Sequence, residues 1–136
     1  MANFLFDKAR QKFLNGELSW ANNEFKVCLL SSGYSANQIQ DETLANIPEL
    51  SRIAISAALT NKDSTGGVAK AATTTLSGVS ATKSIKSLVI FKTAAQLEDS
   101  ILVAYIDSAG GIGDNGLTAT SGTVTIQWNN GEIFKL

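Results

Sequence analysis

The feature that most constrains this chain is a pair of apolar runs, at 88–91 within the segment 84–92 and at 101–106 within the segment 100–107. Both segments have the length of a strand, and Val, Ile, Phe and Tyr make up most of their apolar residues. Such runs are typical of strands that are buried on both faces of a sheet. We therefore expect these two segments to lie at the centre of the sheet.

The rest of the chain also follows a β pattern. Ser, Thr, Ala and Gly dominate its middle part, and stretches with turn composition separate short apolar segments. The favoured architecture is a mainly β fold, a single β-sandwich or barrel of about six to eight short strands, formed by one domain that spans 1–136. Further strands are expected at 24–30, 51–59, 68–76, 117–128 and, after a tight turn at 129–131, at 132–136.

One α-helix is expected near the N-terminus, at 4–15. Asn3 is in position to cap it, and Gly16 is suited to end it. Phe6 and Phe13 fall on one side of this helix, while charged residues take the other. At about three turns such a helix is marginal alone, so we expect it to dock on the rest of the chain.

The aromatic residues of the N-terminal segment favour docking on their own domain. Phe4, Phe6 and Phe13 would form a bare apolar stripe if the segment were a free arm, and such a stripe promotes aggregation before assembly. We therefore expect the segment to brace its own sheet. Further along, Asp41 is in position to cap a brief helix that Pro48 ends.

Charge and cysteine content narrow the classes of partner. Charged residues make up only 17% of the chain, the net charge is −1, and Lys and Arg are scattered. Direct binding of nucleic acid is not expected, because it needs a clustered basic surface. No apolar run reaches membrane-spanning length, so no membrane association is expected.

The single cysteine, Cys28, lies in an apolar run and is predicted to be a buried, inert side chain.

The chain contains no histidine, which removes the common catalytic triads and zinc geometries. Its acids are spread thinly, and the adjacent pairs at 41–42 and 98–99 fall in predicted loops. Adjacent loop acids are usually solvated or capping residues. We therefore expect a protein that is not an enzyme, with no catalytic residues, no cofactor and no metal.

A glycine-rich loop at 110–116 is the one stretch that resembles a ligand-binding motif. It matches G-x-G-x-x-G, but β and turn residues follow it where a dinucleotide loop needs a helix N-terminus. It also resembles one imperfect copy of a calcium-binding repeat, a fold that requires several stacked copies. A cation held between Asp107 and Asp114 remains open.

Five residues are candidates for a partner interface. Trp20, Trp128 and Tyr34 are large aromatic residues with a polar atom, of a kind favoured in interfaces, although for the two tryptophans closure of the core is the alternative. Ile112 and Asp114 lie in the glycine-rich loop. The exposed loops at 31–40 and 108–116 and the two terminal segments are the predicted contact surfaces.

The order of several short motifs resembles a family of small virion proteins of tailed bacteriophages. Members typically begin Met-Ala-Asn-aromatic-Leu-aromatic-Asp-Lys, continue to Phe-Leu-Asn-Gly, and follow with a tryptophan and a strand containing Lys-Val. The resemblance covers essentially the whole chain, and its matching segments are 1–16, 18–20, 25–30, 46–48 with Arg52, 88–92, 102–107, 128–131 and 133–136.

This resemblance implies a non-enzymatic capsid cement, or head decoration, protein. Such a protein is made in the host cytoplasm, binds the outer surface of the major capsid protein shell and stabilises the head. A homotrimer is the oligomer that the resemblance implies. A tail or tail-fibre component is the main alternative, and a small-ligand-binding β-barrel is a third.

Overall fold

A computed structural model describes residues 3–31, 33–77, 85–107, 118–120, 123–126, 128 and 132–135. These residues form a mainly β structure with one α-helix, which confirms the predicted class, and their sheets do not close into a barrel. Strands are more numerous than expected because several are only three residues long. The α-helix and strands are β1 (Asn3–Leu5), α1 (Asp7–Leu14), β2 (Phe25–Leu30), β3 (Arg52–Ile55), β4 (Val68–Lys70), β5 (Thr74–Leu76), β6 (Ser87–Lys92), β7 (Ile101–Asp107), β8 (Thr118–Thr120), β9 (Thr123–Ile126) and β10 (Glu132–Lys135).

A five-stranded antiparallel sheet forms the centre of the molecule, in the order β1-β7-β6-β2-β3. The two apolar runs become β6 and β7, which lie side by side, and β6 is the middle strand. This confirms their predicted central position. All residues of β6 from Ser87 to Phe91 are buried, so side chains on both faces of this strand are covered.

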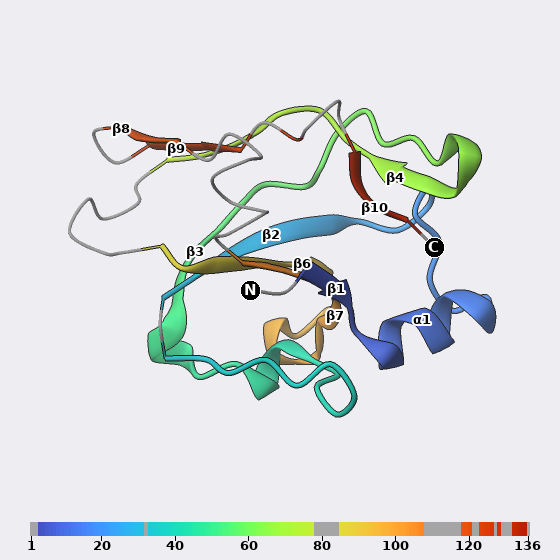
Figure 1. Cartoon of the computed structure of the whole chain (residues 1–136), viewed down its shortest axis with the longest axis horizontal. Helices are drawn as coiled ribbons and strands as arrows, with labels where there is room; N and C mark the ends of the chain where they lie inside the picture. The colour runs from blue at the N-terminus through green and yellow to red at the C-terminus, as the bar shows by residue number, and fades with distance from the viewer. Residues whose placement is uncertain are drawn as a thin grey trace.

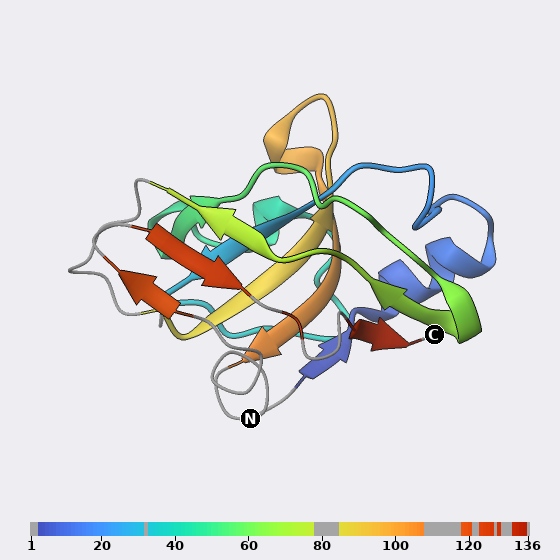
Figure 2. The same ribbon diagram turned by 90° about the horizontal axis from the view of Figure 1, so that it is seen from above.

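The five-stranded sheet is covered by a different kind of structure on each face (Figure 1). One face is covered by α1 and by loops that contain three short 3₁₀ helices of three residues each, η1 (Leu44–Asn46), η2 (Glu49–Ser51) and η4 (Leu97–Asp99). The other face is covered by a two-stranded sheet, β10-β4, and a three-stranded sheet, β5-β9-β8. Figure 2, seen from above, shows these two small sheets lying across the central one.

The N-terminal helix is shorter than predicted, because β1 replaces its first turn. Helix α1 begins at Asp7, and the residue before it, Phe6, has extended backbone angles (φ −67°, ψ 138°). Asn3 therefore does not cap the helix. Pairing with β7 gives the segment sheet hydrogen bonds, including Phe6 N–H to the carbonyl of Val103 at 3.0 Å. The predicted end is confirmed, since Gly16 has φ +79° immediately after the last turn.

The prediction that the N-terminal segment packs on its own chain is confirmed by the contacts of its aromatic rings. Phe4 lies opposite Tyr105 in the β1–β7 ladder and stacks on it, with ring centroids 5.2 Å apart. Phe6 is fully buried, and its ring meets that of Phe4 edge-on. Phe13 packs against Phe134 of β10. The N-terminal segment is thus part of the core of its own chain.

Two predicted strands are shorter or divided in the structure. The segment expected at 51–59 forms only the edge strand β3, where a register shift at Leu29/Leu30 disturbs the pairing with β2. Ile55 faces solvent in part, while Ser56 is buried and its hydroxyl accepts the N–H of Val27 at 2.9 Å. The segment expected at 68–76 is divided between β4 and β5, which belong to different sheets.

Candidate partner-binding cleft

Trp20 closes the core of its own chain. Its side chain is only 7% exposed, and its indole N–H donates to the carbonyl of Lys70 at 3.2 Å. The ring packs on Phe25 and meets Phe134 edge-on. In this chain Trp20 therefore presents little surface to a partner.

Trp128 and Tyr34 occupy different environments. Trp128 is buried, and its indole N–H has no hydrogen-bond partner among the described residues. Tyr34 is half-buried, and its hydroxyl donates to Asp41 at 2.5 Å while its ring meets Tyr105 edge-on. Asp41 also accepts the N–H of Asn37, so it orders this loop and does not cap η1 as predicted.

The two candidates of the glycine-rich loop, Ile112 and Asp114, lie outside the described residues. The same is true of Trp128's neighbours in the 129–131 turn, and the side chain of Asp107 is likewise not described. Whether a cation lies between Asp107 and Asp114 is therefore still open, as it was from the sequence. Within the described residues, no three His, Cys, Asp or Glu side chains gather as metal ligands would.

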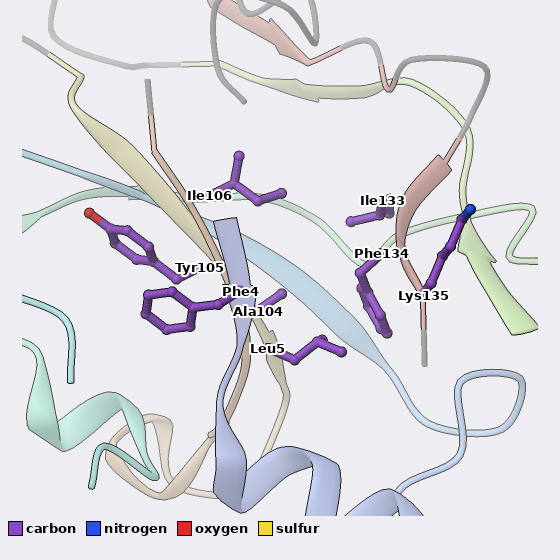
Figure 3. Close-up of a pocket in the computed structure, with 8 residues that line it drawn as sticks. All are labelled: Phe4, Leu5, Ala104, Tyr105, Ile106, Ile133, Phe134 and Lys135. Carbon is purple, nitrogen blue, oxygen red and sulfur yellow. The ribbon is translucent and has the colours of Figure 1, made fainter. Parts of the chain in front are cut away.

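The structure shows an open cleft that the sequence did not indicate. Its first part, here called the strand section, has a volume of about 250 Å³ and lies between β1 and β7 on one side and β10 on the other (Figure 3). In Figure 3, Phe4 and Leu5 point to opposite sides of β1, and Leu5 lies toward Phe134. The strand section is lined by Phe4, Leu5, Ala104, Tyr105, Ile106, Ile133, Phe134 and Lys135.

The cleft continues beside α1 as a second part, here called the helix section, with a volume of about 290 Å³. Leu5 and Lys135 line both sections, so the two adjoin each other. The remaining lining residues of the helix section are Phe13, Leu14 and Arg10. The side chain of Leu14 is 88% exposed at the rim of this section.

The cleft is apolar with a basic rim. Among the described residues that line the two sections, Arg10 and Lys135 are the only charged ones, and none is an acid. The guanidinium of Arg10 pairs with Asp7, one helical turn before it. Lys135 is exposed and forms no ion pair with any described acid. Such a surface suits an apolar group that lies next to a negative charge.

Two strands that end their sheets flank the cleft. β1 is the terminal strand of the five-stranded sheet, and β10 pairs with β4 alone among the described strands. Terminal strands carry backbone groups without sheet partners and are frequent sites of contact between chains. The arrangement therefore favours binding of another chain.

Among the described residues, Cys28 and Tyr34 near the core have pKa values that are raised by burial. Burial raises the pKa of the Cys28 thiol from 9.0 to about 12, against a small opposing effect of Arg52, so the thiol stays protonated at neutral pH. The prediction that Cys28 is buried is confirmed, and a raised pKa is typical of unreactive thiols. Burial, together with the hydrogen bond to Asp41, also raises the pKa of Tyr34.

Comparison with known proteins assigns no family. No protein-family model matches the chain. No sequence among the curated proteins matches it either. In the part of the chain that the structure describes, none of the helices is long and apolar enough to cross a membrane.

Proposed function

We propose that this protein is a bacteriophage capsid cement protein, which binds the outer surface of the major capsid protein shell and stabilises the head. It acts by binding and performs no catalysis. The observation that carries the proposal is the open apolar cleft with a basic rim, flanked by β1 and β10. The resemblance of the sequence to small virion proteins specifies the kind of partner.

The strand section suits a segment of the capsid protein. A partner chain entering beside β1 and β10 can form backbone hydrogen bonds to these strands, while its apolar side chains contact Ile133 and Phe134. An acidic residue on the partner would lie near Lys135. The capsid segment that we propose is therefore extended, apolar and acidic.

Repetition over the shell makes modest affinity sufficient. Each copy that contacts two neighbouring capsid subunits links them, and many such links together oppose the outward pressure of packaged DNA. A homotrimer would link more capsid subunits than a single copy does. The chain's small charge favours this dense arrangement, since a net charge of −1 gives little repulsion between copies.

The alternative is a tail or tail-fibre component. It shares the structural role and the same cleft, and it differs in the part of the virion where the protein lies. Mass spectrometry of purified heads and tails separates the two, because a cement protein appears with the heads. Presence in tails alone would contradict the cement proposal.

Heads prepared with and without the protein test its role in stability. Heads lacking the protein should release DNA at a lower temperature, and adding the purified protein should restore resistance. Ile133→Glu, which places an acid in the strand section, should bind heads at least roughly tenfold more weakly. Leu97→Glu, at an exposed site that lines neither section and lies outside the predicted contact loops, is the matched control. Equal resistance of both kinds of head would refute the proposal.

A further inference from the structure

An exposed leucine lies on a hydrogen-bonded turn between β2 and β3. Leu50 lies in η2 and its side chain is 92% exposed. Pro48 precedes the turn, the N–H of Ser51 donates to the carbonyl of Pro48 at 2.9 Å, and the N–H of Ser31 donates to the carbonyl of Ser51 at 2.9 Å. These bonds hold Leu50 outward next to the exposed acid Glu49. We call Glu49 and Leu50 the knob.

A single exposed leucine is ordinary on a protein surface, so the knob alone indicates no partner. The second observation is the helix section of the cleft, which has the opposite shape and the opposite charge. It is concave and apolar, through Leu5, Phe13 and Leu14, and it carries Arg10 and Lys135. The knob is convex and apolar, and it carries a carboxylate.

The two surfaces cannot meet within one chain. In Figures 1 and 2, η2 and α1 lie toward opposite ends of the longest axis of the molecule. A contact between them therefore joins two copies, and the resulting pair still has one free surface of each kind, one on each copy. Contacts of this head-to-tail type produce closed rings or open filaments.

We propose that the helix section of one copy binds the knob of a second copy. Leu50 enters between Phe13 and Leu14 of the neighbour, and the carboxylate of Glu49 lies near the ammonium group of the neighbour's Lys135. Lys135 is the more available cation, because Arg10 already pairs with Asp7 in its own helix. The strand section stays open for a different partner.

Sedimentation velocity of the full chain over a concentration series tests this contact. The unmodified protein should form an oligomer that dissociates on dilution. Leu50→Asp should weaken association at least roughly tenfold, since it removes the apolar contact and places a charge in the pocket. Ile39→Asp makes the same change at another exposed apolar site and should leave association unchanged.

A charge exchange tests the orientation of the contact. Glu49→Lys alone and Lys135→Glu alone should each weaken association, and the double variant should recover most of the loss. A structural effect of either substitution would not be recovered in this way. Circular dichroism of each variant verifies that the fold is intact.

Cross-linking distinguishes this contact from other modes of association. Leu14→Cys combined with Leu50→Cys should give covalent rings or ladders on mild oxidation, because each copy then has two reactive ends. Each single variant should give dimers at most, since Cys28 is buried. The inference is overturned if the unmodified protein stays monomeric, if Leu50→Asp and Ile39→Asp behave alike, or if the double cysteine variant stops at dimers. None of these outcomes depends on binding to heads, so the cement proposal is tested separately.

Discussion

The substitution Phe6→Ala tests whether the N-terminal segment belongs to the core of its own chain. Phe6 is fully buried at the junction of β1 and α1, and its ring contacts that of Phe4. Truncation leaves a cavity between the central sheet and the helix. Phe-to-Ala changes at such sites cost about 3–5 kcal/mol of unfolding free energy. Since whole domains have about 5–15 kcal/mol, a large part of the stability should be lost.

Urea unfolding followed by tryptophan fluorescence measures this loss. Trp20 and Trp128 are both buried, so their emission should shift to longer wavelength when the core opens. Ile39→Ala, which removes a similar apolar side chain from an exposed site, is the control and should change stability by less than about 0.5 kcal/mol.

Repeating the unfolding measurement at several protein concentrations shows whether the N-terminal segment docks on its own chain or on a neighbouring copy. If the segment docks within its own chain, the loss caused by Phe6→Ala should not change with protein concentration. A loss below about 1 kcal/mol would refute the assignment of Phe6 to the core. A loss that disappears on dilution would show that the segment docks on another copy.

Three further predictions concern single side chains. The Cys28 thiol should not react with a thiol reagent at pH 8 until the protein unfolds. Burial raises the pKa of this thiol from 9.0 to about 12. The stability that the protonated thiol contributes is therefore complete below pH 9 and is lost as the pH rises toward about 12. Arg52→Met should cost about 2–3 kcal/mol in urea unfolding, because Arg52 donates to two backbone carbonyls as well as to Glu98, whereas Glu98→Gln should cost much less. Tyr34→Phe removes the hydrogen bond to Asp41 and should cost about 1 kcal/mol, measured by thermal unfolding.

Each of these predictions has a contradicting outcome. Rapid reaction of the native thiol would show that Cys28 is accessible. Equal costs for Arg52→Met and Glu98→Gln would show that the ion pair dominates and that the carbonyl contacts contribute little. A Tyr34→Phe variant as stable as the original protein would show that water replaces the lost hydrogen bond.

Local sequence predicted the centre of the fold well, because its signal is contained in single segments. The apolar runs that became β6 and β7 carry enough β-branched and aromatic residues to identify buried strands without knowledge of their neighbours. Gly16 likewise marks the end of α1 through its own backbone preference. Elements of this kind need no distant partner to be recognised.

The segments that were predicted incorrectly depend on distant partners. β1 has only three residues, and the helical pattern that follows extends over them in the sequence. Pairing with β7, about a hundred residues away, determines that they are extended. The cleft depends on the same kind of contact, because its walls come from 4–5, 104–106 and 133–135. No single segment contains that information.

The extended conformation of β1 also explains how one short segment serves both the core and the cleft. Side chains alternate between the two faces of a strand, so Phe4 and Phe6 share one side while Leu5 points to the other. Phe4 stacks on Tyr105 and contributes to the strand section, Phe6 is buried in the core, and Leu5 lines both sections of the cleft. In a helix the three consecutive side chains would spread around the axis, and this division would be lost. Weakening the contacts of Phe4 and Phe6 should therefore also disturb the cleft. The stability of the N-terminal segment is in this way linked to the binding that we propose.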